Sequence, residues 1–213
     1  MRKTYTIIMQ QNLLETQNKN DGRVARRENN LNLVLNVVIE MFKEEFLLPS
    51  IDEVAKRSGL SLRTLYRYFA DPNELAEAAI EREFKQNRAL THLPSIGNGH
   101  LNKRIEDFVV MRLKVYENAH SVFRAALHNA LRNQRISEML AERQCFLRNQ
   151  FEKQFATELE SLDKTEYSQV LNTGDLLTQL DSITFLKSQN ELSVFEIKRI
   201  LEWNLFRLLN QPG

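Results

Sequence analysis

The side chains best suited to chemistry lie between Gly59 and Phe69, in the segment GLSLRTLYRYF. An arginine can bind guanine through two hydrogen bonds, and Leu and Thr can contact a thymine methyl group. Tyrosine hydroxyls suit phosphate oxygens. No acidic residue occurs from Val54 to Ala70, whereas four basic residues do: Lys56, Arg57, Arg63 and Arg67. These residue types predict that the segment contacts DNA, although a solvated helix face can carry similar charges.

A short helix must position these side chains. Ser61 is a typical N-cap residue, and it predicts a helix from Leu62 to about Phe69. Leu65 and Phe69 are four residues apart, so both should face the core. The outward face would then carry Leu62, Arg63, Tyr66 and Arg67, flanked by Thr64 and Tyr68.

A second helix precedes this one. Pro49 blocks any continuation of the helix before it, and Ser50 with Glu53 three positions later forms a capping box. The second helix should therefore begin at Ile51, and Gly59 should end it in a left-handed conformation. The pattern predicts a helix-turn-helix, whose second helix can enter a major groove.

The flanking helices are marked by similar signals. An earlier helix carries one apolar face and should end by Glu45 or Phe46; that face is Val34, Val37, Val38, Met41 and Phe42. The segment Asp71-Pro72-Asn73-Glu74 is a further capping box with proline at the first helical position.

Together, these segments resemble the DNA-binding domain of the TetR family, most specifically from Gly59 to Phe69. The resemblance implies base contacts from Leu62, Arg63, Thr64 and Tyr66. It implies phosphate contacts from Ser50, Ser61, Tyr66 and Tyr68, while Arg67 could contact either. Pro72 stands where family members often have a lysine that touches phosphate. Asp52 and Glu53 add phosphate repulsion, so we expect affinity to depend on Arg63, Arg67 and the N-terminal segment.

The chain as a whole is predicted to be all-α, because apolar residues recur with helical spacing and alternating strand patterns are absent. We expect three parts: a flexible basic arm at residues 1–27, a helix-turn-helix domain at 28–80, and a helical effector and dimerisation domain at 81–213. The arm ends in Arg23, Arg26 and Arg27. It is either a solvated leader or a segment that reaches along a DNA groove.

The body beyond residue 80 carries aromatic residues at helical spacing, which usually form plain core. In a TetR-like protein some would line a pocket for a small apolar effector. The candidate pocket residues are Tyr116, Phe123, His128 and Phe151. The sequence leaves open whether an effector exists.

The C-terminal segment indicates a homodimer. A helix is expected to start at Gly174-Asp175, and the capping box from Ser193 to Glu196 should open the last helix. The apolar surface of these helices is wider than one core-facing stripe, so it pairs with a second copy or is buried on both sides within one chain. The expected interface residues are Leu177, Leu180, Ile197, Leu201, Leu205 and Leu208. A two-fold dimer prefers a near-palindromic DNA site.

Composition excludes several other classes. The single cysteine, Cys145, rules out an intramolecular disulfide and favours a cytoplasmic setting. No apolar run approaches the ~18 residues of a membrane span, so no membrane partner is expected. We found no catalytic motif and no metal-ligand spacing among the four histidines, and predict neither enzymatic activity nor a cofactor.

The predicted function is a sequence-specific transcriptional regulator, a repressor released by a small-molecule effector. The alternative is an architectural DNA-binding protein or helical adaptor without an effector. Repression and activation cannot be separated on the sequence.

Overall fold

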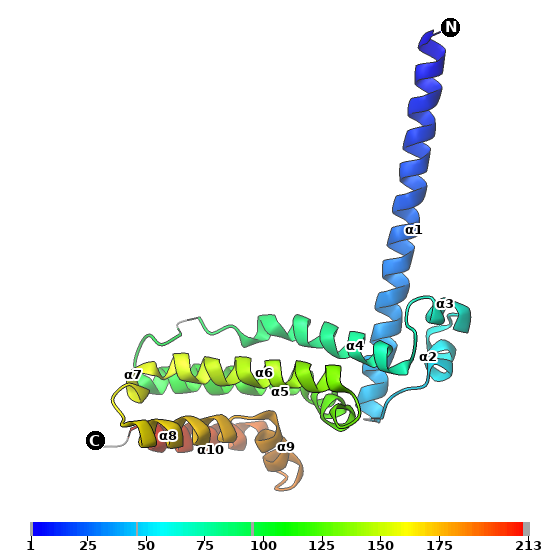
Figure 1. Cartoon of the computed structure of the whole chain (residues 1–213). Helices are drawn as coiled ribbons and strands as arrows, with labels where there is room; N and C mark the ends of the chain where they lie inside the picture. The colour runs from blue at the N-terminus through cyan, green and yellow to red at the C-terminus, as the bar shows by residue number, and fades with distance from the viewer. Residues whose placement is uncertain (1, 46, 95, 211–213) are drawn as a thin grey trace. The chain divides into compact units, whose positions relative to one another are not determined.

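A computed structural model describes the backbone of residues 2–45, 47–94 and 96–210, and side chains within these ranges from Gly22 onward. Every regular element in this part of the chain is helical, which confirms the predicted all-α class (Figure 1). The elements are α1 (Arg2–Glu44), α2 (Ile51–Ser58), α3 (Leu62–Tyr66), α4 (Pro72–Asn87), the 3-10 helix η1 (Arg88–Thr91), α5 (Leu101–Ala130), α6 (Gln134–Gln154), α7 (Ala156–Leu159), α8 (Lys164–Leu177), α9 (Leu180–Ser188) and α10 (Val194–Leu209).

The chain divides into two compact units, and the division falls within α4. The first unit contains α1, α2, α3 and the start of α4 up to Ala79. The second unit contains the rest of α4 and the helices from α5 to α10. No described helix combines the length and the apolar character needed to cross a lipid bilayer.

The first unit is organised around the C-terminal half of α1. Helix α2 packs against α1, and α3 packs against α2. Apolar residues from all four helices are buried, as their periodicity predicts; they include Val38, Phe42, Ile51, Val54, Leu65 and Leu75. The short helices α2 and α3 are therefore held in place by side chains on their inner faces.

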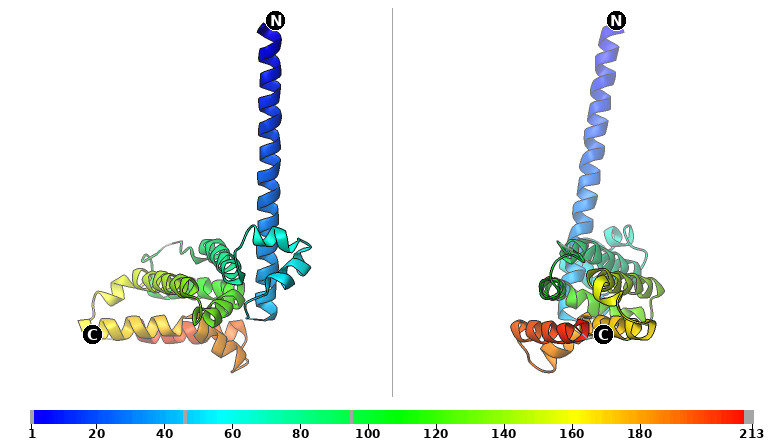
Figure 2. Two further views of the ribbon diagram at one scale, coloured as in Figure 1. Left: turned by 45° about the vertical axis from the view of Figure 1, so that its right-hand side comes forward. Right: turned by 90° about the vertical axis from the view of Figure 1, so that its left-hand side faces the viewer.

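The predicted flexible basic arm at residues 1–27 overlaps α1. Residues 22–27 belong to one continuous helix (Figure 2). The predicted arm also includes residues 1–21, whose side chains lie outside those described. A helix makes its backbone hydrogen bonds internally and needs no apolar partner for them. The residues after Gly22 are mostly good helix formers, Arg and Ala among them, and no proline interrupts them.

The second unit is built on α5, which packs against α6, α9, α10 and η1. Three buried rings form its centre: Phe108 of α5 with Phe151 and Phe155 at the end of α6. The ring centroids of Phe108 lie 5.5 Å from Phe151 and 5.4 Å from Phe155, with edge-to-face geometry. Such aromatic pairs add about 0.5–1.5 kcal/mol beyond the burial of their area.

Helix α8 runs through Gly174 and ends at Leu177, so the predicted helix start at Gly174 is wrong. The next helix, α9, begins at Leu180. Gly174 lies against the ring of Phe151, and a Cβ at this position would overlap that ring. The glycine is therefore required for close packing of α8 on α6, and it does not mark a helix boundary.

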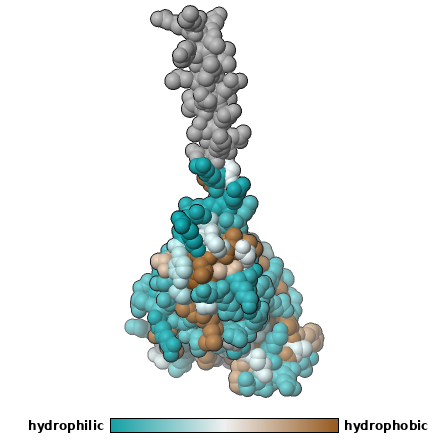
Figure 3. All heavy atoms as spheres, turned by 90° about the vertical axis from the view of Figure 1, so that its right-hand side faces the viewer, coloured by the Kyte–Doolittle hydropathy of each residue, from teal (hydrophilic) through white to brown (hydrophobic). Residues whose placement is uncertain are grey.

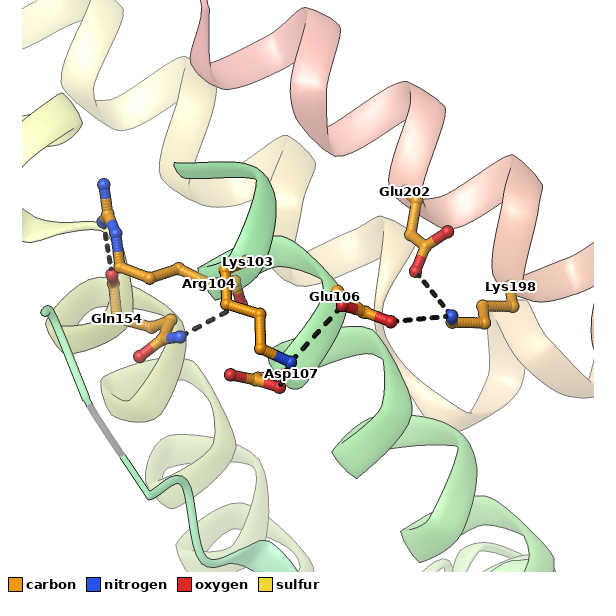
Figure 4. A network of polar contacts seen from close by, with 7 residues as sticks. All are labelled: Lys103, Arg104, Glu106, Asp107, Gln154, Lys198 and Glu202. Atoms are coloured by element: carbon orange, nitrogen blue, oxygen red, sulfur yellow. Dashed lines mark hydrogen bonds and ion pairs between the residues drawn. The ribbon is translucent and has the colours of Figure 1, made fainter. Parts of the chain in front are cut away.

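Hydrogen bonds and an ion pair connect the first turns of α5 to the neighbouring helices (Figure 4). Arg104 donates a hydrogen bond to the Gln154 carbonyl oxygen at 2.8 Å, and the Gln154 side chain donates one to the Arg104 carbonyl at 3.0 Å. Across the helix, Lys198 of α10 lies 3.3 Å from the Glu106 carboxylate. This hydrogen bond from Lys198, with a second from Lys103, lowers the pKa of Glu106. The contacts join α5 to α6 and α10.

Candidate nucleic-acid interface

Two serine caps and one glycine build the turn between α2 and α3. The Ser50 hydroxyl accepts a hydrogen bond from the Glu53 backbone N–H at 3.2 Å. Gly59 has φ of 69°, in the left-handed region, and ends α2. The Ser61 hydroxyl accepts from the Thr64 backbone N–H at 3.2 Å and caps α3. These features confirm the predicted helix-turn-helix geometry, with each cap worth about 1 kcal/mol.

Helix α3 turns one face inward and one outward. Leu65 and Phe69 are buried, whereas Leu62, Arg63 and Tyr66 are exposed. Thr64 is half-buried, because its hydroxyl lies 2.9 Å from that of Ser61 at the cap. The predicted orientation of the helix is confirmed, and its contacts with bases stay a prediction.

The regular part of α3 ends at Tyr66, three residues before the predicted end. Arg67 and Tyr68 follow in a turn, in which the Tyr68 N–H donates to the Leu65 carbonyl at 2.8 Å. The Arg67 guanidinium lies 5.2 Å from the centre of the Tyr68 ring and donates a hydrogen bond to the Tyr68 hydroxyl at 3.2 Å. The end of α3 thus presents a guanidinium and a phenol side by side.

An open groove of about 610 Å³ adjoins this turn. We name it the arginine groove; its lining residues are Arg23, Arg26, Arg27, Asn30, Arg67 and Tyr68. Asn30 donates a hydrogen bond to the Tyr68 hydroxyl at 3.5 Å, and Arg27 lies 5.9 Å from the centre of the Tyr68 ring. The sequence showed the three arginines of α1 as a cluster, but it did not show that they lie beside Tyr68. Their spacing, which puts them on one helix face with Asn30, could have indicated a shared site.

Arg57 contributes less positive charge than the sequence suggested. Its guanidinium lies 2.7 Å from the Glu44 carboxylate and 3.3 Å from that of Glu53. The hydrogen bond with Glu44 raises the pKa of Arg57. The same pairing offsets the phosphate repulsion expected from Glu53. Among the described residues, the positive charge near α3 that lies in no ion pair is therefore that of Lys56, Arg63, Arg67 and the arginine groove.

The start of α4 is closed to phosphate, as the proline at its first position suggested. The Asp71 carboxylate accepts hydrogen bonds from the backbone N–H groups of Asn73 at 2.7 Å and Glu74 at 3.0 Å. Glu74 accepts from the Ala70 N–H at 2.6 Å, one residue earlier than the reciprocal bond of a capping box. Two carboxylates thus occupy the donors that an anion would use.

The four predicted effector residues do not form one pocket. His128 is exposed on α5, so its assignment to a buried pocket is wrong. Tyr116 and Phe151 are buried, and Phe151 is enclosed by Phe108, Phe155 and Gly174. Helical spacing alone could not distinguish the buried side of α5 from its outer side at residue 128.

Phe123 does line a small cavity of about 20 Å³. Arg112 lines it too, and only 1% of Arg112 is exposed. Arg112 donates one hydrogen bond, to the Leu147 carbonyl at 2.6 Å. Its Nε and one terminal nitrogen have no hydrogen-bond partner among the described residues. Burial lowers the pKa of Arg112 to about 9. Sequence reasoning missed this residue, because an arginine in a helical pattern is assigned to the surface.

Four of the six predicted dimer residues are core residues of the protomer. Ile197, Leu201 and Leu205 are no more than 1% exposed in the single chain, since this stripe of α10 packs against α5, α8 and α9. Leu180 is also buried, whereas Leu177 and Leu208 are half-buried. The three α10 residues therefore cannot form a surface for a second copy. The i, i+4 spacing that suggested an interface is that of the inner face.

The outer face of the last helices carries other apolar residues. Leu176, Phe185, Phe195 and Trp203 are each more than half exposed. On α10, Arg199 lies over the Phe195 ring at 5.9 Å and Arg207 over the Trp203 ring at 5.6 Å. A groove of about 650 Å³ beside them is lined in part by Leu192, Ile200 and Trp203. Exposed aromatic side chains with arginines are typical of interface surfaces.

No group of three or more His, Cys, Asp or Glu side chains in the described part of the chain could hold a metal ion. Cys145 is exposed and free.

A capped helix-turn-helix unit followed by a helical unit is the architecture of TetR-family transcriptional regulators, and solved structures of that family match most of the chain. A tetR-family regulator from Streptomyces coelicolor matches with a TM-score of 0.67 and 16% identity, over 85% of this chain and 80% of that chain. The predicted TetR-like fold is confirmed.

Two further structures support the same fold. A regulator of the TerR/AcrR family from Aquifex aeolicus VF5 has a TM-score of 0.61 and 20% identity, over 84% of this chain and 99% of that chain. Salmonella enterica GusR has a TM-score of 0.62 and 18% identity, over 86% and 96% of the two chains. No protein-family model and no curated protein sequence matches the chain.

Proposed function

We propose that this protein is a sequence-specific DNA-binding transcriptional regulator. The observation that carries the proposal is the outward face of α3, where Leu62, Arg63 and Tyr66 are exposed beside a buried Leu65. The side-chain set suits base edges in a major groove. Thr64 would add a base contact, while Ser50, Ser61, Tyr66 and Tyr68 would hold the phosphates on either side and Arg67 could contact a base or a phosphate. Residues 28–80 would form the DNA-binding domain, in a cytoplasmic protein.

The test is a selection of bound sequences from a random DNA pool, made with the wild type and with Arg63→Ala. We expect the wild type to enrich a near-palindromic sequence. Arg63→Ala should relax the preference at one base pair, at a cost of about 1–3 kcal/mol. Arg132→Ala, at an exposed arginine of the second unit, is the matched control. A wild type that enriches no sequence, and binds all duplexes with equal loss as salt rises, would support the architectural alternative.

We propose further that two copies pair through the outer face of α9 and α10, within the segment 81–213. The exposed rings of Phe185, Phe195 and Trp203 support this. Exposed aromatic area of this kind is costly in water and marks interaction sites on soluble proteins. A two-fold pair would present two α3 helices to successive major grooves. Repression would follow from occupancy of the site.

A ligand would act on this dimer by favouring one of its states. Arg112 and Phe123 line a cavity of about 20 Å³, which has room for about one water molecule, so a ligand bound there would require the surrounding helices to move apart. A buried guanidinium with unpartnered donors is costly, and an acidic group on the ligand would satisfy it.

A further inference from the structure

The arginine groove brings four guanidinium groups to one place. Arg23, Arg26 and Arg27 lie on α1 at i, i+3 and i+4, which puts them on one side of the helix. Arg67 reaches the same groove from the turn after α3. All four side chains are exposed. In Figure 3 the described turns of α1 next to the grey atoms are mainly teal, in agreement with this polar surface.

These four charges are not neutralised by neighbouring carboxylates. No ion pair joins any of them to an acidic side chain among the residues whose side chains are described. Arg57, in the same unit, shows the opposite arrangement with Glu44 and Glu53. Among the described side chains, no acidic residue lines the groove. Like charges held together raise the local potential and concentrate anions.

Tyr68 organises the groove. Its hydroxyl oxygen accepts from Asn30 and Arg67, so its own proton is free to donate to a further acceptor. The guanidinium groups of Arg27 and Arg67 both lie near the Tyr68 ring, and this attraction holds their N–H donors beside the groove. The result is a set of donors with no carboxylate among the described lining residues, an arrangement that suits a phosphate oxygen.

We propose that the arginine groove binds DNA backbone phosphates that flank the base pairs read by α3. Arg67 and Tyr68 follow α3 directly in the chain, so a duplex seated on α3 brings its backbone to this turn. Arg23, Arg26 and Arg27 then extend the phosphate contacts along α1, beyond the reach of the short recognition helix. This inference rests on the proposed function and enlarges its DNA site. It also supplies the phosphate contacts that the start of α4 lacks.

The test uses the full chain with the Arg23, Arg26 and Arg27 side chains replaced by alanine, and two duplexes of the selected sequence. The long duplex extends about one helical turn, ~10 base pairs, beyond each end, and the short one ends at the selected sequence. We expect the wild type to bind the long duplex about tenfold more tightly than the short one, and the variant to bind both alike. The slope of log affinity against log salt should fall by about one for each arginine–phosphate pair that the variant removes. The selected sequence should not change.

A control variant removes three exposed positive charges from the second unit by alanine at Arg132, Lys153 and Lys164, and it should behave as the wild type. Circular dichroism should give the same helix content for both variants. The proposal would be overturned if the triple α1 variant still bound the long duplex more tightly than the short one, with the salt dependence of the wild type. In that case an enriched DNA sequence for the wild type would still support the proposed function. A wild type that selects no sequence would refute the proposed function, and the same duplex lengths with random sequence would then test the groove.

Free phosphate compounds are the other source of this chemistry. Sodium pyrophosphate is therefore titrated into the wild type and the triple α1 variant, with isothermal titration calorimetry as the readout. Saturable, variant-sensitive pyrophosphate binding together with unchanged affinity for the long duplex would overturn the assignment to DNA. We expect instead that pyrophosphate competes only weakly with the long duplex.

Discussion

Gly174 of α8 lies so close to Phe151 of α6 that a Cβ on residue 174 would overlap the phenyl ring. The ring cannot withdraw freely, because Phe108 and Phe155 enclose it. The glycine thus sets how closely α8 approaches α6.

Gly174→Ala should therefore destabilise the protein. Overpacking of a filled core costs about 1–3 kcal/mol, although alanine is a better helix former by about 1 kcal/mol. We expect a net loss in the free energy of unfolding, measured by urea denaturation. Gly22→Ala is the control, because no atom lies within 4 Å of a Cβ at that position. Equal or higher stability of Gly174→Ala would mean that α8 can move away from α6.

Tyr68 should ionise below the usual tyrosine pKa of about 10. The hydrogen bond from Asn30 favours the phenolate most, followed by Arg67, and together they lower the pKa of Tyr68. A lowered pKa in the folded state means that phenolate formation stabilises the fold above the unfolded pKa. That contribution is lost as pH falls through the folded pKa.

The measurement is an ultraviolet titration at alkaline pH. The chain has five tyrosines, so the difference between wild type and Tyr68→Phe isolates the one of interest. Asn30→Ala should move this component to higher pH. A Tyr68 component at or above pH 10 in the wild type would contradict the prediction.

Arg112→Met should stabilise the protein at neutral pH. Replacing a buried, poorly paired charge with an apolar side chain of similar shape commonly gains about 1–4 kcal/mol. Because burial lowers the pKa of Arg112 to about 9, the folded wild type holds its proton less tightly than the unfolded chain. Its stability should therefore rise as pH increases above that value. The advantage of Met should be largest below pH 9 and shrink above it.

Urea denaturation at neutral and alkaline pH measures both effects. Arg112→Lys keeps the charge and should show no gain. A destabilised Arg112→Met would mean that the contacts with Leu147 and with the Phe108 ring, 4.6 Å away, outweigh the cost of burial.

Trp203→Glu should convert a dimer into a monomer. The indole is 61% exposed in the single chain, and a carboxylate in its place would remove the apolar contact and add a desolvation cost at the interface, even beside Arg207. Sedimentation velocity should give twice the chain mass for the wild type and a single chain mass for the variant. Leu131→Glu, at a residue 90% exposed after α5, is the control. A dimeric Trp203→Glu protein would place the interface elsewhere.

Local signals in the sequence predicted the helix-turn-helix accurately. Ser50, Ser61 and Ser193 act through hydrogen bonds to residues three positions away, so the sequence itself contains both partners. Gly59 ends α2 through its own left-handed backbone conformation, which depends on no distant residue. The capping box at Ser193 is complete, and the last helix begins where it predicted.

The errors concern residues whose role depends on distant parts of the chain. Gly174 was interpreted as a helix start, and its true partner, Phe151, is 23 positions earlier in the sequence. Ile197, Leu201 and Leu205 form an apolar stripe that fits an inner or an outer face equally well. The burial of Arg112 depends on α6 and α8 closing over α5. Periodicity gives a face to each residue, but it does not say which neighbour covers that face.

The turns of α1 that carry Arg23, Arg26 and Arg27 are exposed from residue 22 to residue 29. A helix segment without a packed face melts at small cost, well before the rest of the fold. If DNA binding orders these turns, heat absorbed in melting them is returned on association, and the binding enthalpy acquires a steep temperature dependence. Occupancy of the site would then fall gradually with rising temperature while the domains themselves remain folded.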